Sequence, residues 1–203
     1  MKILKDILII AVIFSTIITT FVGCKKGDGD PFISLHSRKA RVAGKWKLTN
    51  GTLVYKNTDL SGTIATSTIT YDGTKADKST VIGTGAPTFS SKSYTEEWEF
   101  KKDGSFAGSI IDDGEIRTIS GVWNFTGGVG NYKKKEQLVR TILSLTVINS
   151  MGTSTYTYTG AWNYETYDLH ELKNKEMIWK QNKTFSDSGG SSNEIMFEMT
   201  YKQ

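Results

Sequence analysis

The feature that most constrains the fold is a repeated alternation of apolar and polar residues. Trp98 and Phe100 alternate with charged residues, and the closing segment from Ile195 to Tyr201 alternates in the same way. A period of two places successive side chains on opposite faces of a strand, so each segment has one apolar and one polar face. This pattern is typical of antiparallel sheets that are wetted on one side.

Turn sequences separate these segments. Lys102-Asp103-Gly104 and Asp112-Asp113-Gly114 each lie between two apolar runs, and Asp-Gly there is a strong hairpin signal because glycine supplies the positive φ of a tight turn. We therefore expect eight to ten strands, at about residues 44–56, 64–72, 94–101, 105–111, 115–125, 138–148, 153–160, 164–171, 176–183 and 194–202. An all-β, antiparallel up-and-down meander of this size normally closes into a β-barrel, which removes its edges.

Side-chain phase predicts which residues share a face. One predicted inward set lies on a single strand: Val139, Leu143, Leu145 and Val147. A second set is in phase only if one strand runs through all its members: Tyr156, Tyr158, Trp162 and Tyr164. Such an aromatic set packs in a core or pairs across strands more often than it stacks on sugars or lines a cup. Glu96 shares the phase of Trp98, and we place it at the rim in water; the alternative is an inward position in which it orients a ligand or acts as a base.

The longest connection predicted without secondary structure runs over residues 72–93. It is rich in Gly, Ser and Thr, and Phe89 is its only aromatic residue. Loops of this length are functional or mobile, so we interpret it as a lid or a mobile segment, with Phe89 as the anchor of a lid.

The N-terminus has the pattern of a secretory signal. Two lysines precede an almost wholly apolar run, and Gly23 precedes Cys24, the only cysteine. The segment resembles a bacterial lipobox, which implies that signal peptidase II cuts before Cys24 and that Cys24 carries acyl chains; an ordinary signal peptide with a chance cysteine is the alternative. We expect a signal peptide at 1–23, the lipidated cysteine and a flexible tether at 24–43, and a barrel domain at 44–203.

The ordered motifs resemble those of lipocalin-like lipoproteins of Gram-negative bacteria. They are Gly44-Lys45-Trp46, "EEWEFKKDGSF" from Glu96, "SGVWNF" from Ser120, "YDLHELKNKEMIWKQ" from Tyr167 and the closing "EIMFEMTYK". The resemblance implies a lipocalin-like barrel in which Trp46, next to Gly44, closes one end. In lipocalins an arginine of a late strand often covers this tryptophan. Here the last strand ends with Lys202, and the basic residues of earlier strands include Arg117 and Arg140.

The sequence offers little for catalysis or metal binding. His36 and His170 are the only histidines, and neither a nucleophile-elbow motif nor a metal-ligand spacing is present. Asp112, Asp113 and Glu115 could bind calcium, but turn formation already accounts for them. The net charge of +4 is interspersed except at residues 133–135, which favours a solvated loop over nucleic-acid binding. We predict no enzymatic activity, no cofactor and no metal.

The resemblance implies binding rather than chemistry. We expect a protein anchored by lipid to the outer membrane of the cell envelope, on its periplasmic or its surface face, that binds a small apolar or amphipathic ligand at the barrel end opposite Trp46. The predicted lining is Trp98, Phe100, Phe125, Leu145, Trp179 and Phe197. The alternative is an interaction module with a side-chain-filled barrel that contacts an envelope protein or a glycan.

Overall fold

The computed structural model describes residues 37–126, 137–159, 163–186 and 191–203. They form one short helix and one antiparallel sheet of eleven strands. In chain order the elements are α2 (Arg38–Val42), β1 (Gly44–Thr58), β2 (Ile64–Tyr71), β3 (Lys75–Ile82), β4 (Thr88–Phe100), β5 (Ser105–Asp112), β6 (Glu115–Phe125), β7 (Gln137–Asn149), β8 (Gly152–Thr157), β9 (Tyr164–Leu172), β10 (Glu176–Ser186) and β11 (Ser192–Lys202).

The sheet closes into a barrel of ten strands with one extra strand. Strands β1 to β6 each pair with the next along the chain, β11 returns to β1, and β6 pairs with β7 to close the ring. The extra strand, β8, pairs with the last part of β7, where β9 no longer accompanies it. The predicted up-and-down barrel is therefore the observed fold.

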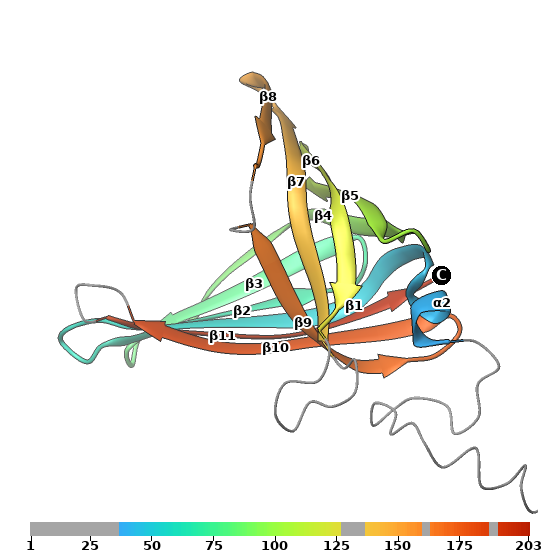
Figure 1. Cartoon of the computed structure of the whole chain (residues 1–203). Coiled ribbons are helices and arrows are strands. Elements are labelled where there is room, and N and C mark those ends of the chain that lie inside the picture. Colours follow the sequence, from blue (N-terminus) through green and yellow to red (C-terminus); the bar gives the residue numbers. More distant parts are fainter. Residues whose placement is uncertain (1–36, 127–136, 160–162, 187–190) are drawn as a thin grey trace, which may run out of the picture.

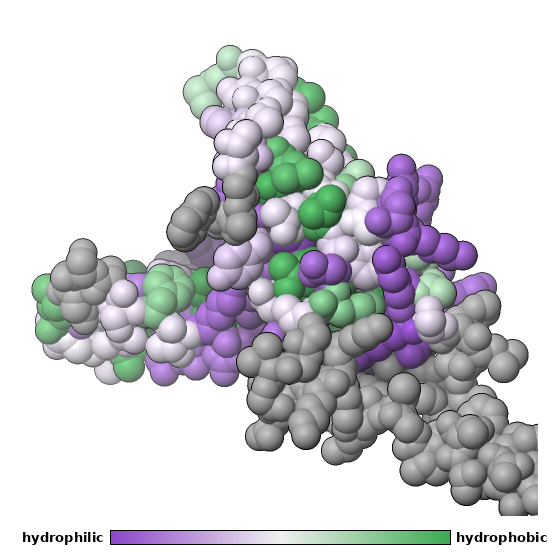
Figure 2. Space-filling model, viewed as in Figure 1, coloured by the Kyte–Doolittle hydropathy of each residue, from purple (hydrophilic) through white to green (hydrophobic). Residues whose placement is uncertain are grey.

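One end of the barrel is narrow because β2 and β3 do not reach it. There Gly44–Lys47 of β1 pairs directly with Glu97–Phe100 of β4, and the β2–β3 hairpin enters between them only from Gly51 onward. The helix α2 lies at this end (Figure 1). Hydrophilic side chains gather around it and around the turn between β4 and β5 (Figure 2).

The other end is wide because the sheet splits into two flaps. The β4–β5 ladder stops at Tyr94 and Asp112, and the β9–β10 ladder stops at Asp168 and Lys180. Beyond these pairs the sheet divides into two parts. The first, which we call the β2–β3 flap, consists of the start of β4 together with β3, β2, β1, β11 and β10. Strands β5 to β8 form the second, the β7–β8 flap. The two flaps diverge from each other at this end of the barrel (Figure 1).

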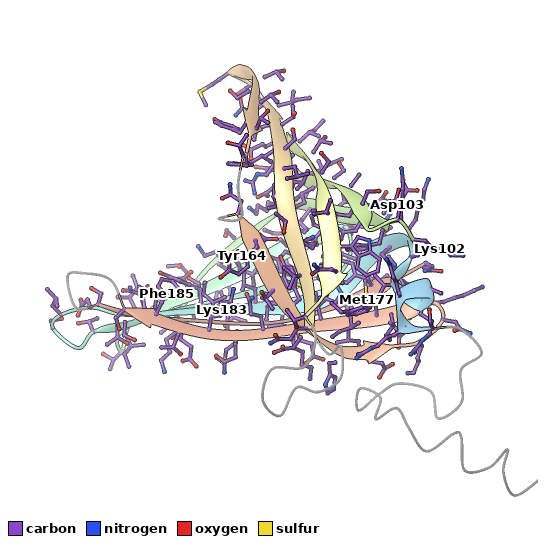
Figure 3. All side chains as sticks on the ribbon, viewed as in Figure 1. Lys102, Asp103, Tyr164, Met177, Lys183 and Phe185 are labelled. Carbon is purple, nitrogen blue, oxygen red and sulfur yellow. The ribbon has the colours of Figure 1, made fainter. Side chains whose placement is uncertain are left out.

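The core fills the narrow half of the barrel. Its largest fully buried side chains come from α2 and from strands on all sides of the barrel: Val42, Trp46, Leu48, Phe100, Leu138, Leu169, Leu172, Met177, Trp179 and Tyr201. Figure 3 shows Met177 at the narrow end, whereas Phe185 of the same strand lies far out on the β2–β3 flap. Packing of this kind stabilises the base and leaves no reason to expect a large ligand there.

Two predictions about the strands are corrected. Residues 72–93 are no loop: they contain β3 and the start of β4, paired in register from Lys75–Ser93 to Thr80–Thr88. Strands β8 and β9 are separate, as their predicted bounds indicated, so the condition for an aromatic set from Tyr156 to Tyr164 is not met. The predicted face of β7 is wrong in the first part of the strand. Its pairing with β6 shifts between Ser120 and Gly121, so β7 has one extra residue, and Leu138 rather than Val139 is the buried neighbour.

Candidate functional site at the floor of the barrel

A buried carboxylate lies where the filled base meets the wide half of the barrel. Glu96 of β4 accepts three hydrogen bonds: its Oε1 from Trp98 Nε1 at 2.6 Å and from the Tyr201 hydroxyl at 2.5 Å, and its Oε2 from the Tyr94 hydroxyl at 2.7 Å. Only 8% of Glu96 is exposed. The predicted rim position in water is therefore wrong: Glu96 lies inward, as the alternative had it, while a role toward a ligand stays a proposal.

The tyrosines around this carboxylate are held in the neutral form. Burial, followed by the charge of Glu96, raises the pKa of Tyr94 and of Tyr201 above the usual value. Burial and the same charge raise the pKa of Tyr71, which packs on Tyr94, to about 12. Neutral hydroxyls are donors, so the arrangement keeps Glu96 hydrogen-bonded without exposing it to water.

A buried guanidinium lies beside the carboxylate. Arg140 of β7 stacks on three aromatic rings, with its Cζ 3.8 Å from the centroid of Trp98, 4.6 Å from that of Tyr167 and 5.1 Å from that of Trp179. Its Nη2 donates to Glu165 Oε2 at 2.6 Å and to the Tyr167 hydroxyl. Burial alone would lower the pKa of Arg140, but the hydroxyl of Tyr167 and the charge of Glu165 act against it, and the pKa is raised.

The floor of the barrel holds donors without acceptors. Arg140 Nε and Nη1 and Trp179 Nε1 are shielded from water, and none of them has a hydrogen-bond partner among the described residues. The guanidinium of Arg140 lies over aromatic rings, which compensate a cation in part. Buried donors are normally paired, so these three atoms distinguish the floor from an ordinary core.

A wall of partly buried apolar residues rises above the floor into the wide half. Most members pack on the buried core from separate strands: Leu53, Ile69, Ile110, Ile119, Ile142 and Phe197. Leu145 faces the same side, since it pairs with Ile119. Because the flaps separate above them, these side chains keep partial access to solvent. We call this region, from the floor to the fork of the flaps, the cup.

The structure divides the six residues predicted to line a ligand site. Trp98, Phe100 and Trp179 are buried in the filled base, where their rings contact one another. Phe125 lies at the narrow end of β6 against Trp123. Leu145 and Phe197 lie on the wall of the cup. The sequence pattern identified inward faces but not height along the barrel axis, and height separates the filled base from the cup.

The two residues predicted to close the barrel lie together at the narrow end. Trp46 is buried, and its Nε1 donates to the carbonyl of Val42 in α2 at 2.7 Å. Gly44 has a φ of +153°, and the side chain of Gln203 occupies the space of a Cβ there. The arginine that stacks on a tryptophan is Arg140, and its partner is Trp98 rather than Trp46.

Sequence reasoning named Arg140 as a basic residue but did not place it inside the barrel. Leu138 and Ile142 lie two residues before and after Arg140 and share its face of the strand, and this apolar alternation was the one sequence pattern that indicated an inward position. The inward position of Arg140 was hidden because β7 has one extra residue near Leu143, which reverses the alternation within the strand. Residues 138, 140 and 142 face inward before it, and Leu145 faces inward after it.

The remaining candidates do not join the floor. Asp112 pairs with Lys92 at 2.6 Å and Glu115 with Arg117 at 2.5 Å, so two of the three acids that were weighed as calcium ligands already have cationic partners. His170 lies half-buried on β9. Four predictions fall on residues outside the described ranges: Cys24, His36, Trp162 and the lysines at 133–135.

Fold and site together define an antiparallel barrel with a filled base, a charged and aromatic floor and an open mouth. Compared with known proteins, the chain matches no family model, no curated protein and no solved structure. Within the described ranges, no helix is long and apolar enough to cross a membrane. Among the same residues, no three His, Cys, Asp or Glu side chains gather as metal ligands would.

Proposed function

We propose that this protein is a lipocalin-like lipoprotein of the cell envelope, anchored in the outer membrane through acylated Cys24, whose cup binds a small apolar or amphipathic molecule. The N-terminal sequence supports the anchor, since a basic start, a short apolar run and a single cysteine follow one another there. The chain would act by holding its ligand, without a cofactor or a chemical step.

The observation that carries the binding proposal is the contrast between the two halves of the barrel. The base is packed, whereas the wall of the cup is apolar and only partly buried. Apolar side chains that keep access to solvent on the inner faces of the two flaps gain free energy when a ligand removes them from water. Leu145 and Phe197 would contact the ligand, and Glu96 and Arg140 would lie beneath it.

Two leucines of one strand test the proposal. Leu145 faces the cup, whereas Leu143, at the register shift of β7, is 41% exposed. The full chain in lipid nanodiscs would be titrated with N-phenyl-1-naphthylamine, a neutral probe whose fluorescence rises in apolar surroundings, with empty nanodiscs as the blank. We expect Leu145→Glu to abolish binding and Leu143→Glu to retain it. Absence of binding to the unaltered chain would refute the proposal.

The tip of the β2–β3 flap favours a second function, an interaction module that contacts a protein or a glycan. Leu60 and Phe89 are each 77% exposed, and Ile82 is 63% exposed. Large apolar side chains gathered at a tip are more typical of contact surfaces than of ordinary surface. Crosslinking on intact cells would test it: a specific neighbour lost in Phe89→Ser, with probe binding unchanged, would support this function.

A further inference from the structure

The unpartnered donors of the floor indicate which polar group a ligand would present. The three atoms, Arg140 Nε, Arg140 Nη1 and Trp179 Nε1, are all donors. Arg140 is 5% exposed and Trp179 is 1% exposed. None of these atoms can accept a hydrogen bond. A ligand group that satisfies them must therefore carry an acceptor oxygen, since a hydrocarbon end would leave the donors as they are.

The charges at the floor indicate whether this acceptor oxygen belongs to a charged or to a neutral group. One guanidinium, Arg140, lies among two carboxylates, and the charges of both Glu165 and Glu96 act on it. Glu96 receives three donors, as a carboxylate does, and Glu165 Oε2 receives two, from Arg140 and from the Tyr167 hydroxyl. The cluster thus already has one more negative than positive charge. A third carboxylate, from a fatty acid, would meet net repulsion in poorly solvated surroundings.

Other charged groups also lie on the inner walls, among them Lys78, which faces the same side as its partner Ile69 on the β2–β3 flap; all of them lie outside the floor cluster. Lys92 pairs with Asp112, and Arg117 pairs with Glu115, at the fork between the flaps. Lys183 lies on β10 toward the tip of the flap (Figure 3), four residues and thus about 13 Å along the strand from Trp179. A carboxylate held by Lys183 at the mouth would leave the donors at the floor unpaired.

We propose that the ligand of the cup is an amphipathic molecule with a neutral acceptor oxygen, such as a long-chain alcohol, amide or ester, which Arg140 and Trp179 bind at the floor. This inference rests on the proposed binding function. The donors are shielded in the ligand-free structure, so the oxygen reaches them when a ring that covers them moves. Tyr167 is the candidate, because it stacks on Trp179 with ring centroids 4.8 Å apart and borders the cup wall at Phe197.

The test compares dodecanol with dodecanoate, which have equal chains and differ in charge. Each would displace N-phenyl-1-naphthylamine from the full chain in nanodiscs, with empty nanodiscs as the blank. We expect dodecanol to compete better than dodecanoate. Glu165→Gln, which removes one negative charge at a half-exposed side chain, should narrow the difference by improving dodecanoate. Equal or better competition by dodecanoate in the unaltered chain would overturn the inference.

A second variant tests the donor directly. Trp179→Phe keeps a buried aromatic ring but removes the unpartnered N–H and part of the indole, so the ligand-free protein should lose some stability through the smaller ring and none through the N–H itself. The affinity for dodecanol should fall about fivefold, as for the loss of one ordinary hydrogen bond. The matched control is Trp123→Phe, whose N–H donates to the Lys101 carbonyl at 3.0 Å; it should lower stability and leave the affinity unchanged.

The outcomes separate this inference from the proposed function. Displacement by dodecanol that Trp179→Phe leaves unaltered, or a preference for dodecanol over dodecanoate that Glu165→Gln does not narrow, would overturn the inference and retain the cup. If neither alcohol nor acid competes while N-phenyl-1-naphthylamine binds, the inference fails and apolar binding stands. If the probe itself does not bind, both proposals fail.

Discussion

Trp98 connects the buried cation of the barrel with its buried anion. The Cζ of Arg140 lies 3.8 Å from the centroid of the Trp98 ring, and Nε1 of the same indole donates to Glu96 Oε1 at 2.6 Å. The electron-rich face of the ring meets the positive group, and its positive edge meets the negative one. One side chain therefore places both charges at a fixed level above the filled base.

The first prediction concerns the buried carboxylate. Glu96→Leu leaves the donors of Tyr94, Trp98 and Tyr201 without their acceptor and Arg140 with one fewer compensating charge. Breaking such a buried network should lower the free energy of unfolding by about 3–5 kcal/mol, measured by urea denaturation. Glu97→Leu is the control, because that side chain is 63% exposed and should change stability by less than about 0.5 kcal/mol. Equal effects of the two substitutions would contradict the buried network.

The second prediction concerns the glycine opposite Trp98. A Cβ on Gly108 would lie 2.0 Å from Cε3 of that indole, so Gly108→Ala forces the ring away from its place under Arg140. Overpacking of this kind should cost about 1–3 kcal/mol, measured by thermal and urea unfolding. Ala107→Val adds volume on the opposite, exposed face of the same strand and should be close to neutral. A stable Gly108→Ala variant would show that the Trp98 ring is not fixed there.

The third prediction concerns the narrow end. Trp46→Ala removes a fully buried ring and should destabilise the protein by about 3–5 kcal/mol. Trp46→Phe keeps a buried ring but loses the hydrogen bond to the Val42 carbonyl and part of the indole volume, so a smaller cost of about 1–3 kcal/mol is expected. Because the indole of Trp46 is directed to the Val42 carbonyl of α2 at the narrow end, both variants should bind N-phenyl-1-naphthylamine normally while they are folded. A stable Trp46→Ala variant that no longer bound the probe would place Trp46 in the ligand site instead.

The fourth prediction concerns alkaline pH. The pKa of Tyr71 is raised to about 12, and burial also raises the pKa values of Tyr94, Tyr167 and Tyr201. In the unfolded chain tyrosine has a pKa of about 10. The folded state thus holds these protons more tightly, and the resulting stability is fully present below about pH 10 and lost as the pH rises further. Urea denaturation should show this loss between about pH 10 and 12, and Tyr71→Phe should reduce it. A free energy of unfolding that stayed constant across this range would contradict the burial of the hydroxyls.

Regular strands were predictable from the sequence because one face of each is buried along its length. Trp46 and Leu48, or Met199 and Tyr201, are inward as their alternation indicates. Strand β3 was missed because both faces of the β2–β3 flap are largely wetted, so its sequence, "KADKSTVI", lacks an apolar face. Local alternation reports burial, and a strand without burial gives no such signal.

The floor of the barrel was only partly predictable. Glu96 was recognised as in phase with Trp98, but its burial depends on a hydroxyl donor from β11, more than a hundred residues away. Arg140 was hidden by the register shift within β7. Contacts between distant strands and a single extra residue in a ladder are properties of the closed barrel, and the pattern of one strand does not contain them.

The most direct test of the central claim is methyl NMR of the full chain in nanodiscs, titrated with dodecanol. The account predicts that the methyl resonances of Leu53, Ile119 and Leu145, on the wall of the cup, shift with intermolecular contacts to the alkyl chain. The methyls of Leu138 and Leu172 in the filled base, and of the exposed Leu143, should stay unchanged. Shifts confined to Leu143 and other outward methyls, or no shifts at all, would contradict a ligand-binding cup.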